Sequence, residues 1–458
     1  MNESKTEVLI IGAGLTGLST GFWLKKAGID FRIIEKENRT GGVINTVSED
    51  GFVFETGPNT GVLSSTELVQ LCIDLGDSCT LDKALPGANK RYIMKNGRWR
   101  PLPSGLFSAI GTPLFSWKDK FRILGEPFRK PGNDPDETVA GLVRRRLGNT
   151  FLDYAVNPFI SGVYAGDPER LVTRFALPKL YNLEQNYGSF IKGSIAKAKQ
   201  QKTELEKKAT KEVFSAKGGL GNLIKALTEK IGEERILTGA SGTEIQKTDK
   251  GYLAIIKKNS GDIIKLNASK IVITTGAYSL QSLLPFVNHN DISKIQNLEY
   301  AKVVQVSIGY KKWDGMKLDA FGGLVPEKEK RKILGILFPS AIFKDRAPES
   351  GALLSVFLGG MRDPGLIEKS DTEITAIVLD EVKKTLFNEK RPDLLRISRY
   401  MHAIPQYEKG SGERFESIRK TESEYPGLIL AGNIRDGIGM SDRVKQAKSI
   451  ADLLSDKR

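Results

Sequence analysis

The chain has 458 residues, of which 40% are hydrophobic and 27% charged, and its formal net charge is +14. This length exceeds what one hydrophobic core supports and predicts two or three domains, and the composition is that of a soluble globular protein. Cys72 and Cys79 are the only cysteines, which excludes a disulfide scaffold and argues against a metal site. No apolar run is long enough to span a membrane, and no nucleic-acid-binding pattern is present, so neither of these classes is expected.

The first fifty residues carry the strongest signal. A short apolar strand is expected over 8–11, a GxGxxG motif follows over Gly12–Gly17, and a second strand over 31–34 ends at Glu35. The first glycine permits the tight turn, the second lets backbone amides approach a pyrophosphate, and the third lets helix and strand pack closely. The helix N-terminus attracts phosphates, and an acid in the position of Glu35 accepts from ribose hydroxyls. The stretch therefore predicts a dinucleotide-binding unit.

The segment Arg39-Thr40-Gly41-Gly42 follows the second strand. It resembles the RxGG element of the FAD-dependent amine oxidases and related enzymes, which lies against the pyrophosphate side of the cofactor. The resemblance makes FAD the expected ligand. Both cysteines precede residue 80, so the C-terminal cysteine that holds flavin covalently in some amine oxidases is absent, and we expect FAD to be bound non-covalently.

Further along the chain, a strand and a loop are expected over 51–61, and a largely helical region over 100–210. Within that region, FISGVYAGDPERL (159–171) reads either as a plain helix end that leads into a turn or as one wall of a pocket for a large, flat, apolar ligand. Its two glycines permit close backbone approach. The eight lysines between 190 and 217 indicate a solvated, basic helix face.

The second half of the chain alternates between strands and helices. We expect an amphipathic helix after the glycines of 217–232, then a small β-meander over 243–248, 252–257 and a third strand, and a separate buried strand in KIVITTGAYS that ends at Gly276. Short strands fill 300–360. The chain closes with a strand, a glycine-rich loop and a helix, whose N-terminus near Met440 is suited to stabilise negative charge on a reduced flavin.

Several stretches resemble one branch of this superfamily, the oxygen-dependent protoporphyrinogen oxidases. They occur in the order of that family and span nearly the whole chain: GPNT (57–60), KRYIMKNGRWRPLP (90–103), FISGVYAGDPERL (159–171), KGGLGNLIKAL (217–227), LFPSAIFKDRAPE (337–349), SVFLGG (355–360) and AGNIRDGIGMSDRV (431–444). The stretches at 159–171 and 337–349 are the more specific ones.

The resemblance implies roles for individual residues. Arg91 matches an arginine that pairs with a porphyrin propionate, and a guanidinium fork suits a carboxylate. Leu324 and Leu337 match two aliphatic residues that sandwich a pyrrole ring, and Phe357 matches an aromatic that stacks on another. Asn59 matches an asparagine at the flavin end of the cavity. The competing interpretation is that the three apolar strand residues simply belong to a core.

The residues expected to bind FAD come from six parts of the chain. They are Gly12, Ala13, Gly14, Leu15, Thr16, Gly17, Glu35, Lys36, Arg39, Gly42, Gly57, Pro58, Asn59, Thr60, Gly242, Gly276, Gly432, Ile438, Gly439 and Met440.

The fold expected from the motifs and the resemblance is α/β, with interleaved domains. A Rossmann-like FAD-binding domain of the GR2, amine-oxidase-like type takes residues 1–75, 212–285 and 415–458. A mixed-sheet substrate-binding domain takes 76–100 and 286–414. A mainly helical, membrane-facing domain takes 101–211.

The implied function is the FAD-dependent oxidation of protoporphyrinogen IX to protoporphyrin IX in heme biosynthesis. Three two-electron removals, each a hydride transfer to flavin N5, make the ring aromatic, and dioxygen reoxidises the flavin to give hydrogen peroxide. No catalytic base is named, since His289 and His402 lie in no catalytic motif. The alternatives are coproporphyrinogen III oxidation to coproporphyrin III, a flavin amine oxidase or carotenoid-type desaturase, and a non-enzymatic binding module with the same fold.

The expected partners are the porphyrinogen, dioxygen, an anionic membrane surface and a neighbouring heme-pathway enzyme, and a homodimer is compatible with the sequence. The N-terminal residues lack the pattern of a signal peptide. We therefore expect a cytoplasmic protein that associates peripherally with the inner face of a membrane through its basic helical region.

Overall fold

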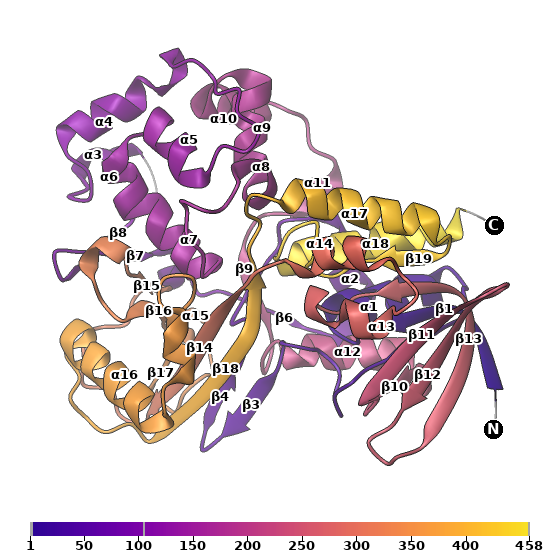
Figure 1. The fold of residues 1–458 in the computed structure, drawn as a ribbon. Helices are drawn as coiled ribbons and strands as arrows, with labels where there is room; N and C mark the ends of the chain where they lie inside the picture. The colour runs from indigo at the N-terminus through magenta and orange to yellow at the C-terminus, as the bar shows by residue number, and fades with distance from the viewer. Residues whose placement is uncertain (1–2, 104–105, 457–458) are drawn as a thin grey trace.

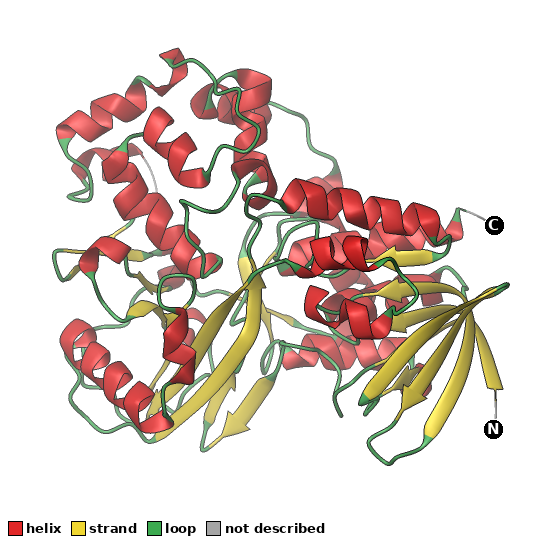
Figure 2. Ribbon diagram, viewed as in Figure 1, coloured by secondary structure: helices red, strands yellow, loops and turns green. Residues whose placement is uncertain are grey.

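The computed structural model describes residues 3–103 and 106–456. Two seven-stranded sheets dominate it, and helices cover both (Figure 2). In Figure 1 the first sheet lies at the right, the second at the lower left, and a layer of helices lies above the second sheet. The long strands β14 (Tyr300–Tyr310) and β18 (Leu394–Pro405) run together from the second sheet toward the first.

The first sheet has the strand order β10-β2-β1-β13-β12-β11, and β19 pairs with β13. Its members are β1 (Glu3–Ile11), β2 (Phe31–Ile34), β10 (Ile236–Leu237), β11 (Gly242–Thr248), β12 (Gly251–Lys257), β13 (Ile263–Ile273) and β19 (Leu428–Leu430). The run from β10 through β2, β1 and β13 to β19 is parallel, whereas β12 and β11 are antiparallel. Parallel strands buried on both faces need continuous apolar sequence, which is why Val8–Ile11 contains no polar residue.

Alternate residues of these strands enter two different cores. Val8 and Ile10 of β1 face a core built with α1 (Leu15–Lys26), α2 (Thr66–Leu75), α12 (Gly221–Ile231) and α18 (Met440–Ser455). Leu9 and Ile11 face a second core built mainly with α5 (Val139–Arg146), α13 (Leu280–Leu283), α14 (His289–Gln296) and α17 (Ser411–Glu424). The period of two along the strand therefore places helices on both faces of the sheet.

The predicted β-meander is confirmed, with one difference. The third strand of the meander and the buried strand that ends before Gly276 are a single strand, the eleven-residue β13. Its first half pairs antiparallel with β12, and almost its whole length pairs parallel with β1. The polar residues Lys265 and Asn267 interrupt the apolar pattern because that half of the strand is only partly buried, and this interruption made one strand look like two.

The second sheet has the order β18-β14-β17-β16-β15-β7-β8. Its remaining strands are β7 (Tyr92–Lys95), β8 (Arg98–Pro101), β15 (Gly322–Leu324), β16 (Ile333–Leu337) and β17 (Ala352–Gly359). All pairs are antiparallel except β15 with β7, which is parallel. One face packs on α16 (Asp371–Leu386) through Val306, Val356 and Ile336, and parts of the other face pack in smaller clusters, such as that of Ile93 with Tyr154.

Two small sheets connect these parts. One pairs β3 (Thr46–Glu49) with β4 (Phe52–Glu55), and the other places β9 (Val213–Ala216) between β5 (Gly61–Val62) and β6 (Leu81–Lys83). The β6 strand, from the predicted substrate-binding segment 76–100, thus pairs with a strand from the predicted FAD-binding segment 212–285. The proposed domain limits stay a prediction.

The region from 106 to 208 is helical. Its α-helices are α3 (Leu106–Gly111), α4 (Trp117–Leu124), α5, α6 (Asn149–Phe151), α7 (Asn157–Val163), α8 (Thr173–Ala176), α9 (Pro178–Tyr187), α10 (Phe190–Ala198) and α11 (Glu204–Lys208). Outside this region, the short helix α15 (Pro339–Ile342) follows β16. None of the helices in the described part of the chain combines the length and apolarity that crossing a bilayer requires.

A fully buried ion pair ties this helical region together. Glu126 and Arg146 are both 0% exposed and form a salt bridge, with the Arg146 Nε 2.9 Å from Glu126 Oε1. Ser189 Oγ and the backbone N–H of Phe190 also donate to Glu126, at 2.6 and 3.0 Å. Burial by itself raises the pKa of Glu126, but these hydrogen bonds outweigh it and the net pKa is lowered. The carboxylate therefore stays charged and joins three parts of the region.

Candidate active site

The GxGxxG motif forms the turn between β1 and α1. Gly12 has a φ of +105°, which an L-residue rarely adopts, and a Cβ on Gly17 would lie 1.9 Å from the Gly12 carbonyl oxygen. A Cβ on Gly14, in contrast, would meet nothing within 4 Å. Gly12 and Gly17 are thus required by the backbone itself, and Gly14 borders open space at the N-terminus of α1.

Glu35 ends β2 beside this turn. Its carboxylate accepts hydrogen bonds from the backbone N–H of Ala13 at 2.7 Å and of Glu37 at 2.9 Å, and the residue is 8% exposed. The segment between β10 and β11 also contacts Glu35, since the Ala240 N–H donates to the Glu35 carbonyl. The predicted residue Gly242 opens β11 just after this contact, and Lys36 is exposed at the edge.

The Arg39–Gly42 loop lies against the glycine turn. Gly41 N–H donates to the Ala13 carbonyl at 2.8 Å. The Arg39 guanidinium donates to the carbonyls of Thr40, Gly42 and Ile44, at 3.1, 2.6 and 3.2 Å. Arg39 therefore shapes this loop from within, a contribution that the motif alone did not reveal.

The loop that connects β4 to β5 contains four predicted cofactor residues, Gly57, Pro58, Asn59 and Thr60. A Cβ on Gly57 would lie 1.9 Å from the Val43 carbonyl oxygen, so the loop packs directly on the segment after Gly42. Asn59 is 8% exposed, and its Oδ1 accepts from the Ser355 hydroxyl of β17 at 2.8 Å. Asn59 thus lies between the predicted cofactor site and the second sheet.

The C-terminal loop supplies the last predicted cofactor residues. Gly432 has a φ of +82° and packs on Thr274, just before Gly276, while Ile438 and Gly439 lead into Met440 of α18. Buried Arg443 donates to the carbonyls of Gly432, Arg435 and Gly437 and holds the loop. The Asp442 carboxylate accepts from Gly439 N–H at 3.0 Å, so this acid offsets part of the positive charge that we expected the helix N-terminus to offer a flavin.

These segments converge because they follow the ends of adjacent parallel strands. The loops after β1, β2, β13 and β19 leave from the same, carboxyl edge of the first sheet, which is where ligands bind in such sheets. The open space at Gly14, the N-terminus of α1 and the Glu35 carboxylate suit the phosphates and ribose of a dinucleotide. The residues present therefore fit FAD.

The three predicted pocket residues on strands share one face of the second sheet. Leu324 pairs across the strands with Gly335, and Gly335 with Phe357. Leu337 pairs with Ser355, two residues from Phe357. Directly opposed residues point to the same face and the period along a strand is two, so all three side chains project together. This face carries the Ser355 that bonds Asn59, and it is opposite to the face covered by α16.

The surroundings of these side chains bear on the choice between a pocket and a core. Leu324, Leu337 and Phe357 are all half-buried, whereas Val356 and Ile336 on the opposite face are 0% exposed in the core beneath α16. The face of the three predicted residues also has buried members, since Leu324 packs against a cluster that includes Ile93, and Phe357 packs against one that includes Val303. Their common face is compatible with a substrate pocket, and that role stays a prediction.

Arg91 lies at the rim of the same face. It immediately precedes β7, in which Ile93 pairs with Leu324, and alternation places Arg91 and Ile93 on one side. Its side chain is exposed, and its guanidinium lies 5.4 Å from the centre of the Phe321 ring. The neighbouring Lys90 belongs to the other side and pairs with Asp319.

The segment 159–171 places helix α7 against the second sheet. A Cβ on Gly162 would lie 2.4 Å from Leu324 Cδ2, so α7 packs directly on a predicted pocket residue. Phe159 and Val163, one turn apart, remain 43% and 45% exposed. The stretch is a helix end that leads into a turn, and its role as a pocket wall stays a prediction.

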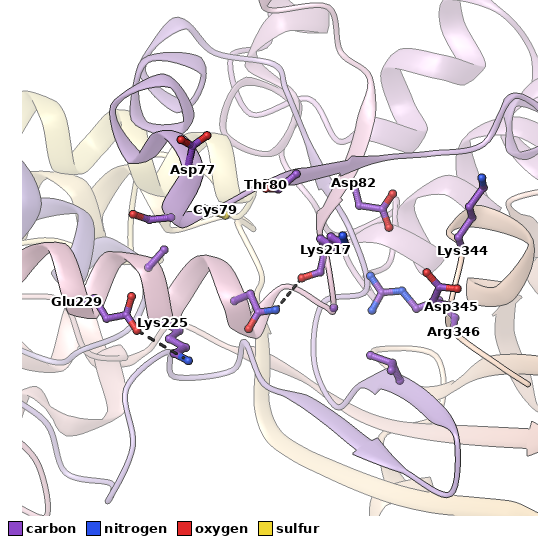
Figure 3. Close-up of a pocket in the computed structure, with 15 residues that line it drawn as sticks. Asp77, Cys79, Thr80, Asp82, Lys217, Lys225, Glu229, Lys344, Asp345 and Arg346 are labelled. Atoms are coloured by element: carbon purple, nitrogen blue, oxygen red, sulfur yellow. Dashed lines mark hydrogen bonds and ion pairs between the residues drawn. The ribbon is translucent and has the colours of Figure 1, made fainter.

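A separate cavity of about 570 Å³ lies between β6, α12 and the loop that carries Arg346 (Figure 3). Acidic and basic side chains alternate around it: Asp77, Asp82, Lys217, Lys225, Glu229, Lys344, Asp345 and Arg346. Arg346 is 4% exposed and donates to Ser215 at 2.9 Å, which anchors its loop. None of the predicted site residues, all of them within the described part of the chain, lines this cavity, and its charged lining does not suit a large apolar ring.

Some residues of the site carried no recognisable motif. Ser355 was within reach of the sequence, because it precedes Phe357 by two residues in SVFLGG and so shares its face. Two other residues could not be found from the sequence. The side chain of Gln305 in β14 donates to the Glu55 carbonyl at 2.8 Å, and the Tyr400 hydroxyl in β18 donates to the Thr56 carbonyl. They come from distant parts of the chain and meet the FAD-side loops only in the folded protein.

The fold and the site define an FAD-dependent oxidoreductase of the amine-oxidase type. The sequence matches the family of flavin containing amine oxidoreductases over residues 15–453, and the chain belongs to that family. Its cofactor is FAD.

Similar proteins span its whole length. A mitochondrial protoporphyrinogen oxidase of Nicotiana tabacum is 30% identical over 99% of this chain and 95% of the relative. A coproporphyrinogen III oxidase of Bacillus subtilis is 26% identical over 99% of both. A solved structure from Exiguobacterium sp. 255-15 covers both chains completely, with a TM-score of 0.80 and 23% identity, and so shares the fold. The resemblance drawn from the sequence is confirmed.

Proposed function

We propose that this chain oxidises protoporphyrinogen IX to protoporphyrin IX with dioxygen as the final acceptor, giving hydrogen peroxide. The observation that carries the proposal is the common face of Leu324, Leu337 and Phe357, which is joined through Ser355 and Asn59 to the loops that fit FAD. A flat tetrapyrrole needs an apolar surface of this kind beside a hydride acceptor.

Bound FAD supplies that two-electron acceptor. The residues of the chain bind and orient the substrate. Leu324, Leu337 and Phe357 contact its pyrrole rings, and the Asn59–Ser355 hydrogen bond fixes the end of the pocket nearest the cofactor. Arg91 at the rim pairs with a propionate. No side-chain base is assigned, since His289 is exposed at the start of α14 and His402 stacks on Tyr278.

The test is turnover of purified protein in air with protoporphyrinogen IX. Appearance of fluorescent protoporphyrin with three molecules of hydrogen peroxide per porphyrin supports the proposal, because the conversion removes six electrons. Protein that binds FAD but forms no porphyrin faster than the uncatalysed oxidation in air would overturn it.

A second candidate is the oxidation of coproporphyrinogen III. The full-length similarity to the Bacillus subtilis enzyme favours it. Because coproporphyrinogen carries four propionates, it would gain more from basic residues at the rim, such as Arg98 and Arg100 on the hairpin strand beside Arg91. Parallel assays with both porphyrinogens at several concentrations discriminate, and the substrate with the higher kcat/KM is the assigned one.

We also propose that the enzyme is cytoplasmic and associates peripherally with the inner face of a membrane, and that helix α4 makes the contact. Trp117, Phe121 and Leu124 lie on one side of α4 and are 62%, 68% and 64% exposed, and Phe128 beyond it is 88% exposed. Figure 1 shows α4 at the outer edge of the helical layer. An apolar face that points outward, flanked by basic residues such as Lys120, is typical of helices that lie in a membrane interface.

Co-sedimentation with vesicles tests this contact. Binding to vesicles that contain anionic lipid, weakened by high salt and by the change Phe121→Ser, supports it. The matched control is Phe387→Ser, which removes an aromatic that is 73% exposed but distant in sequence and fold, beyond α16. Equal binding of both variants, or no binding by the wild type, would overturn it; concentration-dependent self-association abolished by Phe121→Ser would instead assign the surface to a second copy.

A further inference from the structure

Strand β18 belongs to the second sheet, yet its C-terminal half lies along the loops that fit FAD. The Tyr400 hydroxyl donates to the Thr56 carbonyl, just before the Gly57–Thr60 loop. Further on, the Tyr407 hydroxyl donates to the Asn433 carbonyl in the C-terminal loop at 2.9 Å. Between these two contacts lies His402. Strand β18 and the residues just after it thus touch the cofactor side at successive points.

His402 makes its contact through a ring. Its imidazole stacks on Tyr278, with ring centres 4.0 Å apart and planes 23° apart. Tyr300 packs edge-on against both rings, at 5.7 Å from Tyr278 and 5.5 Å from His402. The Tyr300 hydroxyl accepts from the backbone N–H of Ala277 at 3.0 Å. Tyr300 is buried and fixed, so it supports the two outer rings from behind.

Tyr278 lies at the edge where the cofactor loops meet. It follows β13, whose last residue Ile273 pairs with Ile11 of β1, the residue before the glycine turn. A Cβ on Gly276 would lie 2.3 Å from Tyr278 Cε1, so the ring folds back over the predicted cofactor residue Gly276. Tyr278 is 55% exposed, so its outer face is open to a ligand.

The charge state of the two rings is the same. Partial burial of the phenol and the Glu35 carboxylate, the predicted ribose partner, both raise the pKa of Tyr278, so the phenol is neutral at neutral pH. Partial desolvation and the neighbouring Lys302 lower the pKa of His402, so the imidazole is neutral as well. The coupling of Tyr278 to Glu35 also places this ring near the predicted ribose end of the cofactor site.

We propose that the Tyr278–His402 stack is a latch on the adenosine end of FAD. Tyr278 covers the adenosine beside Glu35, and His402, held on β18, keeps the ring in place. The packing of the second sheet against the first thereby sets how long FAD is retained. An offset aromatic pair contributes beyond its buried area, which corresponds to a two- to tenfold change in an equilibrium constant.

The latch is tested by the release of FAD from the holoenzyme after dilution, followed by the rise in flavin fluorescence. Tyr278→Ala and His402→Ala should each weaken FAD binding two- to tenfold. The variants Tyr278→Phe and His402→Phe keep a ring and should retain FAD like the wild type. Because both alanine changes remove the same contact, the double variant should bind FAD no more weakly than the weaker single variant.

Two further measurements separate a latch from a general loss of structure. With excess FAD present, the visible spectrum of the bound flavin in the alanine variants should equal that of the wild type, since the flavin end is untouched. The control is Met401→Ala on the same strand, next to His402 and also exposed, which should leave FAD release unchanged. FAD retention by His402→Ala equal to that of the wild type, or a loss in His402→Phe as large as in His402→Ala, would overturn the proposal.

Discussion

Arg91 offers the sharpest test of the substrate pocket. The change Arg91→Ala removes a guanidinium from the rim of the face that carries Leu324 and Phe357. A charge-assisted hydrogen bond to a propionate is worth about 1.5–3 kcal/mol, and a fully exposed ion pair only about 0.2–1 kcal/mol. Arg91 is exposed in the free protein but becomes partly covered when a tetrapyrrole lies on this face. We therefore expect about 1.5 kcal/mol, roughly a tenfold fall in kcat/KM.

The assay is steady-state porphyrin formation over a range of porphyrinogen concentrations. The loss should appear as a higher KM with nearly unchanged kcat, because the propionate contact is the same in the ground and transition states. Arg91→Lys should recover only part of the loss, since a point charge replaces a bidentate fork. The matched control, Lys90→Ala, removes the adjacent charge, which points away and pairs with Asp319, and should leave KM unchanged.

A substrate analogue makes this test independent of folding. A porphyrinogen esterified at its propionates should bind the wild type more weakly and should be nearly indifferent to Arg91→Ala. An unchanged KM of Arg91→Ala for the free acid would refute the assignment of this residue. An equal loss with the ester would show that Arg91 acts through packing on Phe321, which its guanidinium overlies, rather than through charge.

Three other results are expected. Glu35→Gln should weaken FAD binding by about 1.5–3 kcal/mol, because a charged acceptor beside the glycine turn is lost; FAD titration checks this, with exposed Glu37→Gln as a control that should retain wild-type affinity. Arg146→Met should lower the free energy of unfolding by about 3–5 kcal/mol by leaving the Glu126 charge buried and unpaired, as followed by thermal melting, and an unchanged Tm would contradict the account of this pair. Since the pKa of Glu126 is lowered on folding, its stabilising contribution is full above about pH 4.5 and is lost as the pH falls through the lower folded-state value, so the gap in Tm between wild type and variant should narrow in acid. Acid precipitation should release all FAD into solution, and flavin that stays with the precipitate would disprove non-covalent binding.

The resemblance placed Leu324, Leu337 and Phe357 in a pocket, but the sequence alone could not exclude a core. Each lies in a short apolar strand, and such strands look alike whether they are covered by a helix or by a ligand. The structure adds the cross-strand pairing, in which Gly335 aligns Leu324 with Phe357 on the face opposite to α16, and the pocket itself stays a prediction. The register depends on how several strands pair, so it cannot be deduced from the sequence of one strand.

The division of β13 shows the same limit in the fold. Its polar half and apolar half have different periodicity because their second neighbours differ: β1 runs along almost the whole strand, whereas β12 pairs with the first part and β19 with the last three residues. The pattern of apolar residues in a short segment indicates which residues are buried, but it does not indicate which neighbouring strand buries them. The expected boundaries were therefore wrong at this point, although both segments were correctly recognised as strands.

By itself, the sequence determined the cofactor unit and its ligand. The turn at Gly12, the close packing at Gly17 and the acid at the end of β2 are local requirements, set within some thirty residues, and each allows few residue types. The tertiary structure decided what surrounds the ligand. The Asn59–Ser355 bond, the Tyr278–His402 stack and the outward face of α4 join or expose residues according to how two sheets and a helical layer pack. These contacts are long-range, and side chains of many kinds satisfy them, so they leave no pattern in the local sequence.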